Sequence, residues 1–145
     1  MIARHQVLLL LAGLGIAAGT GCKKGSEPAS SGATMAPAEL KISDVQVGRR
    51  VGANSRIADA TDDFSPRDTI YVVAVTEGAA PSATLTARWT FEDGQVVKED
   101  SRTIAPSGTE ATEFHISKPG GWPKGKYKVA VAVGGSTQTK DFEVK

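Results

Sequence analysis

Side chains able to catalyse a reaction or bind a metal are few in this chain of 145 residues. Cys22 is the only cysteine, and the histidines are His5 and His115. A single cysteine excludes an intrachain disulfide, a CxxC redox pair and a cysteine-based zinc cage. His115 lies between Phe114 and Ile116, so strand alternation directs it to solvent. Glu113 and Ser117 share its face, but a catalytic set would need a nucleophile or acid held in fixed geometry. We therefore expect no enzyme activity, no metal and no other cofactor.

Aspartates gather around one turn, where Asp59, Asp62, Asp63 and Asp68 flank residues 64–67. Calcium prefers such oxygen ligands and could draw several from one loop. The D-x-[DN]-x-[DN]-G spacing of a calcium loop is absent, however, and an aspartate beside a turn commonly accepts hydrogen bonds from nearby backbone N–H groups. We expect Asp63 or Asp68 to cap a short turn, with calcium binding as the alternative.

The two tryptophans call for different interpretations. Trp89 alternates with polar residues inside 85–91, which predicts a core position. Trp122 lies in the turn 120–125, where its indole either covers one end of the core or protrudes as a binding aromatic. Covering is the preferred interpretation because large apolar side chains are mostly withdrawn from water. Trp122 is nevertheless retained as a possible partner-binding residue.

The stretch 48–67 is the longest connection that the pattern leaves between strands. Connections longer than about 15 residues in compact domains usually have a role or their own structure. We expect it to form the contact surface for a partner protein. The alternative is that Val51 and Ile57 form a short strand or flap on the sheet. The basic residues proposed to bind the partner are Arg49, Arg50 and Arg56.

The amino terminus has the pattern of an export signal. Arg4 precedes an uncharged apolar run over 7–18, which is too short to cross a hydrocarbon core of about 30 Å as a helix. Residues 19–22, Gly-Thr-Gly-Cys, resemble the bacterial lipobox. The resemblance implies a signal peptide over 1–21 and lipidation of Cys22, which then becomes the new amino terminus. A free thiol behind an ordinary cleavage site is the alternative.

The residues after Cys22 extend this interpretation. The sorting rule that comes with the resemblance retains proteins with aspartate in the next position at the inner membrane, so Lys23 favours the outer membrane, facing the periplasm. Residues 23–38 are rich in Gly, Ser, Pro and Ala, which predicts a flexible linker. Without residues 1–21 the basic and acidic residues are 16 each. That balance provides no electrostatic footprint for nucleic acid.

From Glu39 onward the apolar residues recur with period two, which predicts one domain over 39–145. About seven short strands with no helical stripe indicate an all-β, immunoglobulin-like sandwich. The β-branched run 70–75 suggests a strand central in its sheet, and the first strand has an irregular step at Asp44. The expected strands cover 40–47, 70–75, 85–91, 96–104, 112–117, 126–133 and 137–144.

Two glycine-containing turns predict hairpins. Asp93-Gly94 is a type I′ signal, and a two-residue loop there places Trp89 opposite Lys98. A two-residue loop at Gly134-Gly135 places Tyr127 opposite Phe142, and it also pairs lysines with acids on the outer side. Cross-strand pairs of this kind contribute about 0.2–1 kcal/mol each, and a one-residue slip would lose them together. The expected charge pairs are Lys128 with Asp141 and Lys126 with Glu143.

Several segments together resemble a family of small uncharacterised bacterial lipoproteins. They are 68–71 (DTIY), 87–89 (ARW) with 93–95 (DGQ), 114–116 (FHI), and 121–123 (GWP) with 125–129 (GKYKV). The resemblance implies an immunoglobulin-like domain and no assigned activity. We expect a non-enzymatic, membrane-anchored binding or accessory module that contacts an envelope protein, with no small-molecule substrate. The alternative is a protease-inhibitor-like sandwich that presents its long connection to an envelope protease.

Overall fold

The computed structural model describes residues 39–145. The predicted signal peptide, the lipidation site Cys22 and the linker 23–38 lie outside the described residues. Within 39–145, no helix is long and apolar enough to cross a membrane.

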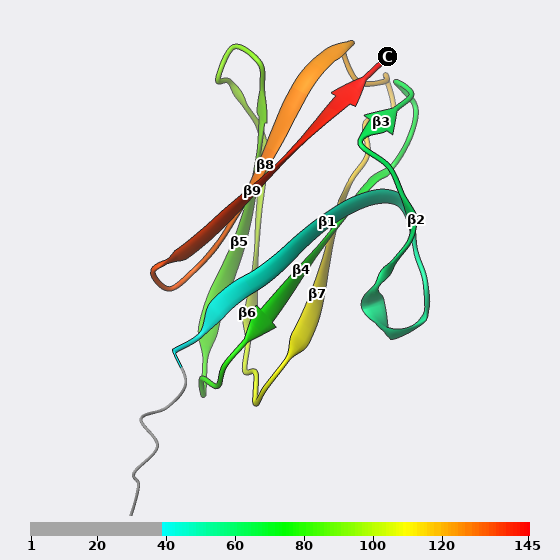
Figure 1. The fold of residues 1–145 in the computed structure, drawn as a ribbon. Helices are drawn as coiled ribbons and strands as arrows, with labels where there is room; N and C mark the ends of the chain where they lie inside the picture. The colour runs from blue at the N-terminus through cyan, green and yellow to red at the C-terminus, as the bar shows by residue number, and fades with distance from the viewer. Residues whose placement is uncertain (1–38) are drawn as a thin grey trace, which may run out of the picture. The chain divides into compact units, whose positions relative to one another are not determined.

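Nine strands form two sheets that pack into a sandwich (Figure 1). One sheet has the order β2-β1-β4-β7 and the other β3-β9-β8-β5-β6. All neighbours pair antiparallel except β3 and β9, which are parallel. The strands are β1 Lys41–Val51, β2 Ile57–Ala60, β3 Asp63–Phe64, β4 Ile70–Glu77, β5 Ala83–Phe91, β6 Val96–Ile104, β7 Glu110–Ile116, β8 Gly125–Val133 and β9 Ser136–Val144.

This architecture confirms the predicted all-β sandwich and corrects its strand count. The two additional strands, β2 and β3, lie inside the stretch that the pattern left as a connection. A single 3-10 turn, η1 Ala53–Ser55, joins β1 to β2. The stretch 48–67 is therefore largely structured. Val51 pairs with Ile57, as expected from the alternative interpretation that these two residues form a short strand or flap.

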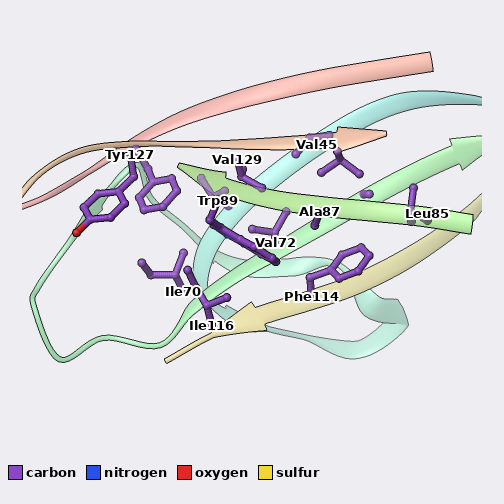
Figure 2. Close-up of a cluster of buried hydrophobic side chains, with 14 of the residues drawn as sticks. Val45, Ile70, Val72, Leu85, Ala87, Trp89, Phe114, Ile116, Tyr127 and Val129 are labelled. Atoms are coloured by element: carbon purple, nitrogen blue, oxygen red, sulfur yellow. The ribbon is translucent and has the colours of Figure 1, made fainter. Parts of the chain in front are cut away.

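The core fills the space between the two sheets (Figure 2). Trp89 of β5 is fully buried, and its ring meets that of Phe114 of β7 edge to face, with centroids 6.3 Å apart. Alternating residues of β5 and β8 enter this layer, as period-two patterning predicts. An edge-to-face pair contributes about 0.5–1.5 kcal/mol beyond the area it buries. Trp89 is thus a structural residue.

Strand β4 is central in its sheet, between β1 and β7. Val72 faces the core, while Val73 and Val75 face the opposite side of the sheet. Those two valines are nevertheless only 0% and 4% exposed. Burial on both faces explains why the sequence of β4 is a nearly continuous β-branched run instead of an alternation.

The two hairpins follow their predictions to different extents. Tyr127 pairs with Phe142 across the β8–β9 turn, and Lys128 and Lys126 lie opposite Asp141 and Glu143 as expected. Among the described residues, Lys128 forms an ion pair with Asp141 at 3.6 Å, whereas Lys126 forms none. Trp89 pairs with Lys98 as predicted, but the register then shifts and Thr90 pairs with Val96. The loop at Asp93-Gly94 is therefore not the predicted two-residue type I′ turn, and φ is positive at Gly94 but not at Asp93. A second irregularity lies in β1 between Ile42 and Asp44, where the irregular step was predicted.

The two sides of the sandwich differ. On one side β1 is tied to β9, because Ser136 Oγ accepts a hydrogen bond from the Ile42 N–H (3.1 Å) and Gln138 Nε2 donates to the Ile42 carbonyl (2.9 Å). On the other side β6 and β7 are the last strands of their sheets. The described chain begins at one end of the sandwich and finishes at the other (Figure 1).

Candidate functional site

The end of the sandwich that is remote from Glu39 is filled with aromatic rings. Tyr127 stacks on Phe142 with centroids 5.4 Å apart, and Phe91 meets Tyr127 edge to face at 5.0 Å. Phe64 of β3 meets Phe142 at 5.5 Å. The Tyr127 hydroxyl donates to the Pro123 carbonyl at 2.7 Å. This aromatic cluster holds the loops 61–69 and 117–124 against the two sheets.

Trp122 belongs to the same cluster. Its side chain is buried, with 6% of the residue exposed, and its ring lies 6.3 Å from Tyr127. The indole Nε1 donates to the Asp68 carbonyl at 3.2 Å. Trp122 therefore covers the core, as the preferred interpretation had it. Its ring does not protrude from the surface as a binding aromatic.

Asp68 organises the turn that follows β3. Its Oδ2 accepts the Ser65 N–H at 2.8 Å and Arg49 Nε at 3.0 Å. The Ser65 hydrogen bond, assisted by Arg49, holds the pKa of Asp68 below its usual value, although partial burial opposes this. Asp68 thus caps a turn, which is the role that the sequence indicated for it or Asp63.

Arg49, predicted to contact a partner, is exposed but is held by contacts within the domain. Besides its ion pair with Asp68, Arg49 Nη2 donates to the Asp63 carbonyl at 2.7 Å. Its guanidinium also lies 5.8 Å from the centre of the Phe64 ring. Three different contacts fix this side chain to the loop 61–68. The sequence could not reveal this role because Asp68 is 19 residues away along the chain.

Arg50 and Arg56 are different, because both are exposed and neither forms an ion pair among the residues described. They flank the tip of the β1–β2 hairpin, whose residues 52–56 are all exposed. At the tip, Asn54 and Ser55 have φ of 63° and 52°, the left-handed region that non-glycine residues seldom occupy. The candidate partner-binding surface is therefore this hairpin tip with its two free arginines.

Two of the three remaining acids around the turn, Asp62 and Asp63, are paired with lysines. Lys140 pairs with Asp62 at 3.3 Å, and Lys145 pairs with Asp63 at 2.9 Å. Within residues 39–145, no group of three or more histidine, cysteine, aspartate or glutamate side chains is arranged to hold a metal ion. A hollow beside these acids has a mixed lining, formed by Asp62, Asp63, Lys126, Asp141, Phe142 and Glu143.

His115 faces solvent on β7, as predicted from its neighbours. Its Nδ1 lies 3.3 Å from Glu113 Oε1, and its ring lies 5.5 Å from the ring of Tyr71 on β4. The sequence did not indicate the Tyr71 contact, because that pairing depends on the β4–β7 register. No other titratable side chain in the described part of the chain pairs with His115. The arrangement lacks the nucleophile that an acid–base site would activate.

No protein-family model and no curated protein matches this chain. Among solved structures, a cycloisomaltooligosaccharide glucanotransferase from Paenibacillus resembles 72% of this chain at 18% identity, with a TM-score of 0.53, over 14% of the enzyme's length. A putative β-galactosidase from Bacteroides fragilis resembles 70% at 19% identity, with a TM-score of 0.49, over 17% of its length.

The CARDB domain of a Pyrococcus furiosus protein resembles 75% of this chain at 13% identity, with a TM-score of 0.47, over 90% of that domain. The chain thus spans less than a fifth of either enzyme. At these identities, the likeness to the glucanotransferase shows a shared fold and nothing about activity. What the comparison with the glucanotransferase establishes is a shared β-sandwich fold.

Proposed function

We propose that this chain is a non-enzymatic, lipid-anchored accessory module of the bacterial envelope that contacts a partner protein through its β1–β2 hairpin. The observation that carries the proposal is the exposed hairpin tip with Arg50 and Arg56. Rigid sheets that carry exposed loops are a common scaffold for recognition. The sole histidine of the described domain lacks a nucleophile beside it, which supports a binding role over catalysis.

The anchor part of the proposal depends on Cys22 and the apolar run before it. Several acyl chains on one residue hold a protein firmly on a bilayer, whereas a single chain binds marginally. The Cys22→Ser variant should leave the membrane fraction and keep the thermal melt of the domain. Retention of the variant in the membrane pellet through an alkaline wash would contradict lipidation at Cys22. Lys23 supports the outer membrane, facing the periplasm, as the location.

The test is crosslinking in the native cells, followed by recovery of the module and its partners. Arg50→Glu with Arg56→Glu should weaken partner recovery at least several-fold while the thermal melt stays unchanged. Arg49 is kept, because its reversal would break the contacts to Asp68. The matched control reverses Lys98 and Lys124, which are also exposed and form no ion pair within residues 39–145. Equal recovery from both double variants would remove the hairpin from the proposal.

A protease-inhibitor-like role remains the second candidate. The exposed tip with left-handed Asn54 and Ser55 is the feature that favours it, since a protruding loop of fixed shape is what a protease cleft accepts. Inhibition of envelope protease activity by the purified chain would support this role. Partner capture without inhibition would instead favour the accessory role.

A further inference from the structure

Strand β7 is the exposed edge of its sheet, with seven residues and no strand on its outer side within 39–145. The tip of the β1–β2 hairpin lies near it. No backbone hydrogen bond joins residues 52–56 to β7 among the described residues. Its outward N–H and C=O groups are therefore available to another strand. A groove opens beside this edge, lined by Arg102–Ile104 of β6 and Glu110–Glu113 of β7.

The edge of the other sheet, β6, is protected in a way that β7 is not. The residues of β6 opposite Trp89, Ala87 and Leu85, which face the core, are Lys98, Asp100 and Arg102. Inward-pointing charges on an edge strand oppose the addition of a further strand. At the corresponding positions β7 carries Thr112, Phe114 and Ile116, all buried. Strand addition is therefore favoured at β7.

The charges along β7 and just after it form a pattern that is complementary to itself. Counted from Phe114, acids stand one and four residues before it (Glu113 and Glu110), and bases stand one and four residues after it (His115, and Lys118 two residues beyond the end of β7). Two copies of such a strand placed antiparallel, with Phe114 opposite Phe114, bring each acid opposite a base. Shifting the centre to Glu113 would instead place the two Glu113 carboxylates together.

This register also satisfies the geometry of a two-fold axis. In an antiparallel pair related by an axis perpendicular to the sheet, opposite residues point to the same face. Glu113 and His115 are both on the outer face of β7, and Thr112 and Ile116 are both on its inner face. The Phe114-centred register pairs Glu113 with the second copy's residue 115, and Thr112 with its residue 116. In this register, outer-face residues pair with outer-face residues, and inner-face residues pair with inner-face residues.

From these observations we infer that the β7 edge binds a second copy of this chain, antiparallel and centred on Phe114, so that two four-stranded sheets join into one. The inference does not rest on the partner proposed for the β1–β2 hairpin, because it uses the backbone edge of β7 and neither Arg50 nor Arg56, although the hairpin tip lies near that edge.

Sedimentation equilibrium of the full chain in mild detergent, with Cys22→Ser as background, tests the association. The chain should form a reversible dimer with a Kd between about 1 µM and 1 mM, the range expected of small interfaces. Glu113→Lys removes the acid from both inner acid–base pairs and should raise the dimer Kd about tenfold or more. Combining Glu113→His with His115→Glu again places an acid opposite a base and should return the Kd to near the parent value. Thermal melts of each variant check that the fold is retained.

Disulfide trapping tests the register. Ala111→Cys with Ser117→Cys places thiols opposite each other only across the proposed pair. Within one chain these positions are six residues apart on a strand, about 20 Å, far beyond disulfide reach. The matched control, Thr109→Cys with Ser117→Cys, fits the Glu113-centred register instead. Oxidation should yield at least tenfold more dimer with the first pair.

A parent chain that stays monomeric over the whole concentration range would overturn the inference. So would preferential trapping by the control cysteine pair, which would mean a different register. Loss of the dimer in the charge-exchanged variant together with retention in Glu113→Lys would equally overturn it, because charge complementarity would then not direct the pairing. None of these results bears on the hairpin, whose test is partner recovery.

Discussion

Two antiparallel hairpins of the same sandwich, β8–β9 and β1–β2, hold their shape in different ways. In β8–β9, nine residue pairs follow one another without interruption. In β1–β2, three pairs are separated by two register shifts. The inner face of β8–β9 carries buried valines and aromatics, whereas β2 has only Ile57 half-buried and three exposed residues.

The difference shows what specifies register. A one-residue slip of β8 against β9 would turn Tyr127 and Phe142 out of the core together, so a single alignment is favoured. A slip of β2 would move little apolar surface, and bulges are tolerated there. The β1–β2 hairpin is instead held at its base, by Arg49 and its contacts to Asp63, Phe64 and Asp68. Side-chain pinning leaves the tip free for a partner.

The largest effect should come from the packed hairpin. Phe142→Ala would remove a ring that stacks on Tyr127 and meets Phe64. We expect a loss of about 3–5 kcal/mol in the free energy of unfolding, measured by denaturant titration. Ile57→Ala, the matching change in β2, should cost well under half as much. Comparable losses in both variants would contradict the distinction between the hairpins.

The next largest effect on stability is expected at Asp68, which holds Arg49 at the base of the β1–β2 hairpin. Asp68→Asn removes the charge that Ser65 N–H and Arg49 contact, and hydrogen bonds to charged groups contribute about 1.5–3 kcal/mol. The pKa of Asp68 is lowered in the fold, so its contribution is present above the unfolded-state pKa and is lost as the pH falls through the folded-state pKa.

The stability difference between the parent and Asp68→Asn should therefore be full at neutral pH and shrink in acid. Denaturant titrations at a series of pH values measure it. A difference that is constant from neutral to strongly acidic pH would mean that the Asp68 charge does not fix the turn.

A smaller effect is expected at the β8–β9 turn, where Gly134 has φ of 54°. Gly134→Val strains the backbone without a clash, since nothing lies within 4 Å of the added Cβ. We expect a loss of about 1 kcal/mol and a melting temperature several degrees lower. Gly135→Val is the control, because its Cβ also meets open space and its φ is not in the left-handed region.

The smallest effect is at the tip of β1–β2. Ser55 has φ of 52° without being glycine, so Ser55→Gly should relieve strain. After the entropy that glycine loses on folding, a gain of about 0.5 kcal/mol is expected, as a slightly higher melting temperature. Destabilisation by this change would indicate that the Ser55 side chain has contacts that hold the tip.

Much of the fold could be predicted because alternation is strong where one face is buried. The β6 boundaries and the pairing of Tyr127 with Phe142 were both predicted, since turn glycines and cross-strand pairs are local signals. Strand β2 was expected only as the alternative, from Val51 and Ile57, because one half-buried isoleucine is a weak signal. Strand β3 was not expected, because a two-residue parallel pairing leaves no periodicity to detect.

The candidate site was less predictable, for a related reason. The basic residues 49, 50 and 56 look equivalent in the sequence, yet Arg49 is committed to Asp68 and Phe64. That distinction depends on which loop the β1 strand meets in space. The same holds for Tyr71, whose contact with His115 requires the β4–β7 register. Long-range contacts of exposed side chains leave no trace in local patterns.

The course of β1 has a mechanical consequence. A pull exerted at Glu39 and resisted at the opposite end of the domain would run parallel to β1. Strand β1 pairs with β4 from Lys41 to Gly48, and hydrogen bonds of an antiparallel pair lie perpendicular to the strands. Such a load shears these bonds together instead of peeling them one by one. A domain held by its amino-terminal end would thus be loaded in shear along β1, the direction in which a β-sheet resists force most strongly.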